Sequence, residues 1–224
     1  MTKFYRFIRF LVSLVIKPLY PVKVFGQRKL DEKKTLLAIN HLSNLDPVLA
    51  GCYLKPQLHF WAKRELFKNK FFGSVLRKLG AVPINRGEAD IASIKSALTL
   101  LKDGKIFTLF PEGTRNKAGE TDADMLQIKN GLAMLAIKSQ SPIRAALFYR
   151  KPKVFRRNYL IIGDEFSLET FYGQKISADV LSEASKIIEQ KFDELREKFD
   201  ALLTEKGVKK IENELKTDEA LNNT

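Results

Sequence analysis

The sequence predicts an α/β layered fold, in which helices flank a largely buried mixed sheet. The first observation is that short apolar segments of strand length alternate with helical segments along most of the chain, as in layered α/β proteins. The second is that 45% of the 224 residues are hydrophobic, which supplies a sizeable core for one domain. The third is an amphipathic helical pattern at the N-terminus and a long one near the C-terminus.

The elements follow from hydrophobic runs and from the residues that interrupt them. The predicted strands cover residues 22–25, 35–39, 58–63, 80–84, 105–110, 143–149 and 159–162. The predicted helices cover residues 47–54, 90–101, 131–139 and 179–205, the second of them stopped by Asp103-Gly104. Residues 64–80 mix phenylalanines with lysines and arginines and indicate a basic, aromatic surface, and residues 111–124 read as a polar loop.

These elements suggest three parts. Residues 21–206 form the α/β domain, residues 1–20 an N-terminal helix, and residues 207–224 a tail that we expect to be frayed, because its apolar content is low.

The N-terminal segment combines basic and apolar residues. Its apolar run from Phe7 to Ile16 contains Arg9 and ends at Lys17-Pro18, too short for a spanning helix, which needs about 20 residues. A signal peptide is the main competitor, but no Ala-x-Ala-like site follows. Another alternative is a plain amphipathic helix packed on its own domain. Because apolar residues surround the helix, we predict an interfacial membrane-binding helix.

The net charge of +13 requires an acidic partner. No nucleic-acid-binding module is recognisable, so we expect an anionic membrane surface and no nucleic acid. The single cysteine, Cys52, excludes an internal disulfide framework. With only two histidines besides, we expect no zinc site and no other metal.

The stretch NHLSNLDP, residues 40–47, carries the first candidate site. His41 follows a buried strand, and Asp46 comes five residues later, before Pro47. If the chain turns from strand to helix here, Asp46 can bind one ring nitrogen of His41 and leave the other as a general base. The competing interpretation is that Asp46, alone or with Ser43, only caps the helix that follows.

Two further strands end in similar polar residues. Residue 84 leads into Arg86, and residue 110 leads into Glu112-Gly113-Thr114-Arg115. If these strands run parallel to the one before His41, all these residues converge at one edge of the sheet. Two arginines there suit a phosphate or carboxylate. Gly113 allows close backbone approach and Thr114 adds a hydroxyl donor.

The motifs NHLSNLDP, GAVPINRG and FPEGTRN, in this order and spacing, resemble those of the PlsC-type 1-acylglycerol-3-phosphate acyltransferases from about Tyr20 to Phe148. The resemblance implies that His41 is the general base and Asp46 its orienting partner. It implies that Arg86, Glu112, Gly113, Thr114 and Arg115 hold the glycerol phosphate of the acceptor. It also suggests Lys63 near the reacting carbonyl or the phosphate.

The implied reaction moves an acyl chain from acyl-coenzyme A or acyl carrier protein to the sn-2 hydroxyl of lysophosphatidic acid, giving phosphatidic acid. It needs a base and oxyanion donors but no cofactor. Arg144-Ala145 stand where the family commonly has a second proline, in a block that shapes the acyl site.

Several alternatives stay open. A related acyltransferase could use glycerol 3-phosphate, a lysophospholipid or an amino-acid lipid as acceptor. A non-catalytic membrane-surface protein is the rival from another class.

The basic residues beside the N-terminal helix also predict a location. We expect a peripheral or monotopic protein at the cytoplasmic face of the inner (plasma) membrane.

Overall fold

The computed structural model describes residues 1–27, 30, 33–85, 90–110 and 122–221, and in 122–129 and 204–221 the backbone alone. In this part of the chain, seven strands form one sheet in the order β1-β7-β6-β2-β5-β3-β4. The strands are β1 (Val22–Phe25), β2 (Thr35–Ile39), β3 (Leu58–Lys63), β4 (Ala81–Ile84), β5 (Ile106–Leu109), β6 (Ile143–Phe148) and β7 (Asn158–Phe166). The helices are α1 (Lys3–Leu19), α2 (Asp46–Tyr53), α3 (Lys70–Lys78), α4 (Ile91–Lys102), α5 (Asp122–Ser139) and α6 (Ala178–Leu221), with short 3₁₀ turns η1 (Arg64–Phe67) and η2 (Glu169–Phe171).

The sheet is mixed. Strand β2 pairs in parallel with β5 and β6, and β3 pairs in parallel with β4 and β5, so these five strands run the same way. Strand β7 is antiparallel to β6, and β1 pairs in parallel with β7, so both run the opposite way. The predicted α/β layered fold with a mixed sheet is confirmed.

Strand β2 lies near the middle of the sheet because both of its faces are apolar. Leu36, Leu37, Ala38 and Ile39 have no exposed surface. A strand with parallel neighbours and helices on both faces carries such a continuous apolar run. Burying each leucine or isoleucine contributes about 1.5–3 kcal/mol, so this short strand stabilises both layers of the core.

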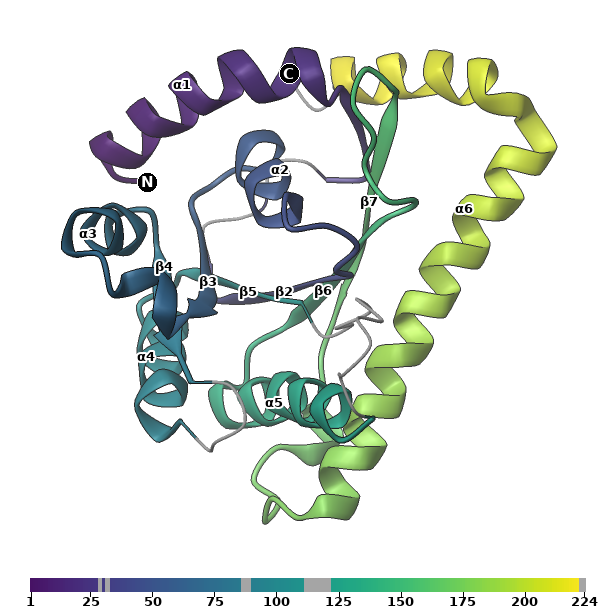
Figure 1. Ribbon diagram of the computed structural model, residues 1–224. Helices are drawn as coiled ribbons and strands as arrows, with labels where there is room; N and C mark the ends of the chain where they lie inside the picture. The colour runs from purple at the N-terminus through teal and green to yellow at the C-terminus, as the bar shows by residue number, and fades with distance from the viewer. Residues whose placement is uncertain (28–29, 31–32, 86–89, 111–121, 222–224) are drawn as a thin grey trace.

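Helices cover both faces of the sheet (Figure 1). Leu37 and Ile39 pack on the side of α2, in a cluster that also takes up Val12 and Ile16 of α1. The opposite side is covered by α4, α5 and α6, whose buried residues pack with Leu36 and Ala38.

Two helices extend beyond their predicted limits. Helix α5 begins at Asp122, so the end of the predicted polar loop is helical. Helix α6 does not end near residue 205 but continues to Leu221, into the predicted tail. Hydrophobic periodicity is a guide to helix limits only where apolar residues recur, and residues 122–124 and 206–221 contain few of them. The division into a helix, a domain and a tail at residues 20 and 206 stays a prediction.

Helix α1 has two apolar faces. Its inner face includes the buried Tyr5 together with Val12 and Ile16, which pack on the domain. Its outer face exposes a row of large side chains at helical spacing: Phe7, Phe10, Leu11, Leu14 and Val15. Among the described helices, none is both long and apolar enough to cross a membrane.

Two helices end at a glycine with positive φ. Gly80 follows α3 with φ +97°, and Gly104 follows α4 with φ +70°. Their surroundings differ: a Cβ atom at Gly80 would lie 2.7 Å from the carbonyl oxygen of Leu58, whereas one at Gly104 would meet nothing within 4 Å.

Alanine substitutions at Gly80 and Gly104 separate the effect of backbone strain from that of steric conflict. Gly104→Ala should lower the free energy of unfolding by about 1 kcal/mol, because only the left-handed backbone is penalised. Gly80→Ala should lower it by about 3 kcal/mol, because the start of β3 must also move. Denaturant unfolding of both variants measures the difference, and equal losses would contradict the steric contribution.

Candidate active site

The loop between β2 and α2 brings His41 and Asp46 together. The Nδ1 atom of His41 lies 3.0 Å from Oδ2 of Asp46. The same oxygen accepts hydrogen bonds of 2.6 Å from the backbone N–H groups of Leu42 and Ser43. The Asp46 side chain is fully buried, whereas the His41 side chain is 14% exposed. A buried carboxylate thus holds the ring of a histidine that remains open to solvent.

The simple capping interpretation of Asp46 does not match this geometry. Asp46 is the first residue of α2, and no side-chain cap bond closes the start of that helix. Its side chain contacts the preceding loop and His41 rather than the amides of the helix. These contacts therefore position the loop and the imidazole. The catalytic roles of His41 and Asp46 stay a prediction.

Asn40 anchors this loop, although the sequence analysis assigned it no role. Its side chain is buried and donates to the carbonyl oxygen of Phe148 at 2.9 Å, while its Oδ1 accepts from the N–H of Phe148 at 2.6 Å. It thereby binds the end of β2 to the end of β6. A buried polar residue directly before the histidine was the available signal, since such residues need partners.

The carboxyl ends of β2, β5, β3 and β4 meet at one edge of the sheet, because these strands are parallel. His41 follows β2, and its ring lies 4.8 Å from that of Phe110, which follows β5. Lys63, the last residue of β3, is exposed at this edge. Arg86, Glu112, Gly113, Thr114 and Arg115 lie outside the described residues, although β4 and β5 end just before them.

Asp90 bonds to residues on both sides of positions 86–89. Its Oδ1 accepts from the N–H of Ser93 as the cap of α4, and its Oδ2 accepts from the N–H of Asn85, both at 3.0 Å. Arg64 adds a contact of 3.3 Å. The hydrogen bonds from the Asn85 and Ser93 amides hold the pKa of Asp90 far below its usual value. The ends of the segment that contains Arg86 are thus tied to one carboxylate.

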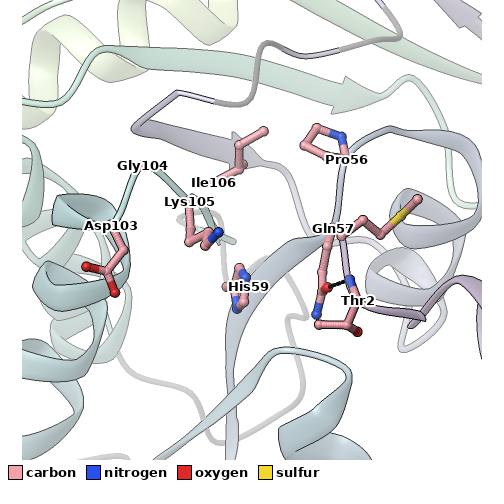
Figure 2. Close-up of a pocket in the computed structure, with 9 residues that line it drawn as sticks. Thr2, Pro56, Gln57, His59, Asp103, Gly104, Lys105 and Ile106 are labelled. Carbon is pink, nitrogen blue, oxygen red and sulfur yellow. Dashed lines mark hydrogen bonds between the residues drawn. The ribbon is translucent and has the colours of Figure 1, made fainter. Parts of the chain in front are cut away.

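The second histidine lies at the opposite edge of the sheet. His59 lines a cavity of about 370 Å³ with Gln57, Lys105 and Ile106, near the starts of β3 and β5 (Figure 2). Burial, and then the nearby charge of Lys105, lowers the pKa of His59. The two histidines therefore belong to separate environments.

Arg144 is also distant from His41. It is the second residue of β6, and its guanidinium contacts Gln27 at 2.8 Å and Glu165 at 3.7 Å. Arg144 thus lies toward the start of β6, away from the edge that carries His41. Among the described residues, no three histidine, cysteine, aspartate or glutamate side chains form a group that could hold a metal ion.

The fold and the His41–Asp46 pair define an α/β enzyme domain with a candidate base at the carboxyl edge of its parallel strands. Residues 21–148 match the family model described as Acyltransferase. The chain belongs to this acyltransferase family.

Several relatives of this chain share one enzyme name. The 1-acyl-sn-glycerol-3-phosphate acyltransferase of Bacillus subtilis is 30% identical over 206 residues, covering 88% of this chain and 100% of that protein. The enzyme of the same name from Borreliella burgdorferi is 26% identical, covering 84% of this chain and 71% of its own length. The crystal structure of the 1-acyl-sn-glycerophosphate acyltransferase PlsC from Thermotoga maritima has a similar fold, with a TM-score of 0.61 and 20% sequence identity, over 88% of this chain and 80% of that one.

Asn40→Ala should lower both stability and turnover. It removes the side chain that bonds to the N–H and carbonyl groups of Phe148, which should reduce the free energy of unfolding by about 3 kcal/mol. Because the loop is then less well fixed, kcat should fall while the KM for acyl donor changes little. Denaturant unfolding and steady-state kinetics measure the two effects, and wild-type values in both would refute the anchoring role.

Asn40→Asp is the matched control. It keeps the acceptor for the Phe148 N–H but places a carboxylate against the Phe148 carbonyl oxygen. Protonation should relieve this repulsion, so the folded-state pKa lies above the unfolded one and stability should rise as the pH falls. A pH-independent stability would contradict the arrangement.

Asp90 should make stability depend on pH in the opposite sense. Its folded-state pKa is lowered, so its contribution is complete above the unfolded pKa of about 4 and disappears as the pH falls toward the folded value. The stability difference between wild type and Asp90→Asn should therefore be largest near neutral pH and shrink below about pH 4. Because asparagine is also a good cap, this variant removes the charge and keeps the bond to Ser93. Unfolding measured over a range of pH checks this, and a stability difference that does not change with pH would refute the lowered pKa of Asp90.

Proposed function

We propose that this protein transfers a fatty acyl chain from a thioester donor to the sn-2 hydroxyl of 1-acylglycerol 3-phosphate, giving phosphatidic acid. The observation that carries the proposal is the buried Asp46 carboxylate on Nδ1 of a partly exposed His41, in a chain that belongs to the acyltransferase family. The acceptor is taken from the relatives, which are named 1-acyl-sn-glycerol-3-phosphate acyltransferases.

His41 acts as the general base. Asp46 accepts a hydrogen bond from Nδ1–H and stays ionised, which leaves Nε2 as the base. Nε2 takes the proton of the sn-2 hydroxyl as the oxygen attacks the thioester carbonyl carbon. The tetrahedral intermediate then collapses, its carbon–sulfur bond breaks, and the imidazolium returns the proton to the leaving thiolate. The Asp46 charge stabilises the imidazolium between these two steps.

The acceptor phosphate binds to Arg86 and Arg115, with Glu112, Gly113 and Thr114 around the glycerol. Two guanidinium groups suit a phosphomonoester because each offers paired donors. The ends of β4 and β5 lie at the same sheet edge as His41, which supports this assignment. Lys63 at the end of β3 lies where it can stabilise the oxyanion or the phosphate. The donor is acyl-coenzyme A or acyl carrier protein.

The protein works at the surface of an anionic membrane, as a peripheral or monotopic protein on the cytoplasmic face. The outer row of α1, from Phe7 to Val15, is exposed, and a bilayer can bury it. The net charge of +13 favours anionic lipid. His41 and its neighbour Phe110 lie on the side of the sheet that α1 and α2 cover, so an acceptor can be used while its chain stays in lipid.

The reaction is tested by acyl transfer to 1-acylglycerol 3-phosphate in detergent micelles. His41→Ala should lower kcat by about 10³-fold, because a general base contributes that much. Arg115→Ala should act mainly by raising the KM for the acceptor. The matched control is His59→Ala, which removes the other histidine at the opposite edge of the sheet and should keep the wild-type kcat.

Glycerol 3-phosphate and a neutral lysophospholipid are offered as competing acceptors. Preference for either of them would overturn the proposed substrate but leave the base in place. Full activity of His41→Ala would overturn the mechanism.

A further inference from the structure

The turn between β6 and β7 holds two large apolar side chains in solvent. Val154 and Phe155 are 44% and 76% exposed. A phenylalanine ring left in water gains none of the free energy that its burial provides. The described part of the chain leaves this ring uncovered, so the turn presents it to something outside the domain.

The exposure of Phe155 is imposed by the local structure. The residue has φ +55°, a left-handed conformation that is unfavourable for a bulky side chain. The buried Asn158 holds the turn in this shape, since its amide donates to the carbonyl oxygens of Lys153 and Arg156 while its Oδ1 accepts from the N–H of Lys153. These hydrogen bonds restrain the turn, so the ring does not fold back onto the domain.

The turn is joined to the C-terminal end of α1. The N–H of Phe155 donates to the carbonyl oxygen of Leu19 at 2.7 Å, and the N–H of Asn158 donates to that of Pro21 at 2.8 Å. The β6–β7 turn accordingly lies beside the end of α1 (Figure 1). The exposed ring thus belongs to a turn that is bonded to the end of α1, the helix with the exposed apolar row.

The charge of the turn indicates what covers it. Between residues 150 and 163 there is no acidic residue, and the cations are Arg150, Lys151, Lys153, Arg156 and Arg157. All five are exposed. Basic residues around a short apolar tip match a surface of anionic head groups over an apolar interior.

We propose that the β6–β7 turn is a second membrane anchor, in which Val154 and Phe155 enter the acyl region of an anionic bilayer and the surrounding cations contact its phosphates. Together with α1 it forms one docking surface, which fixes the orientation of the domain on the membrane. This inference rests on the membrane association in the proposed function and adds a second point of contact. The outer row of α1 already directs one face of that helix toward the bilayer, and the turn adds a second contact that limits the tilt of the domain.

The first test is co-flotation of the full chain with vesicles of phosphatidylcholine and phosphatidylglycerol. Phe155→Asn removes the ring but tolerates the left-handed backbone, and it should lower the partition coefficient about tenfold. Lys153→Glu with Arg156→Glu should do the same in low salt only, since salt screens the attraction. The control for the ring is Ile91→Asn, and the control for the cations is the double variant Lys175→Glu with Lys186→Glu. These positions are exposed on the opposite side of the sheet, so both control variants should float like wild type.

The second test reports insertion directly. Cys52 is the single cysteine and is buried, so Phe155→Cys can be labelled selectively with an environment-sensitive dye. Its emission should shift to the blue with anionic vesicles and be quenched by lipids that carry a quencher in their acyl chains. The same dye on Ile91→Cys should show neither effect.

The outcomes separate this inference from the proposed function. If Phe10→Asn with Leu14→Asn abolishes flotation while the turn variants float normally and the dye at 155 does not respond, α1 is the anchor and the second anchor is refuted. If the turn variants keep flotation but lose transfer from an acyl carrier protein donor, the turn docks an acidic protein and the membrane assignment is overturned. Acyl transfer in micelles tests the reaction independently of both.

Discussion

The candidate site depends on one buried carboxylate. Oδ2 of Asp46 accepts hydrogen bonds from two consecutive loop amides and lies 3.0 Å from Nδ1 of His41, whereas its buried Oδ1 has no partner among the described residues. Burying an unpaired carboxylate would cost several kcal/mol, and the contacts of Oδ2 and the positive end of α2 offset part of that cost. The carboxylate therefore determines the path of the loop, and the loop in turn determines the direction of the imidazole.

The loop is held at its other end by the sheet. Asn40 extends the pairing between β2 and β6 by one residue through its side chain, using both hydrogen-bonding groups of Phe148. His41 is thus placed between a rigid strand end and a rigid helix start. A base must keep its position to within a fraction of an ångström to be effective, and the described contacts restrain this loop on both sides.

The proposed membrane surface and the candidate base are consistent in their arrangement. Helices α1 and α2 cover the side of the sheet on which His41 meets Phe110, and the turn that carries Phe155 is bonded to the end of α1. In the proposed reaction, the lipid acceptor reaches the protein from the bilayer. An enzyme that keeps its base on the side of its membrane-binding elements can act on the glycerol without extracting the whole lipid.

The sequence alone determined the strands, the fold class and the candidate pair, because these depend on local patterns. The run from Leu36 to Ile39 is apolar on both faces, which requires burial in the sheet, and the spacing from His41 to Asp46 requires a turn. The sequence alone did not identify the contacts of residues whose partners are distant in the chain. The role of Asn40 depends on Phe148, 108 residues away, and the position of the Phe155 turn beside α1 depends on its bond to Leu19. Only the tertiary structure decided these contacts and the strand order, since a local pattern states that a group must be buried or paired but not which distant segment will do it.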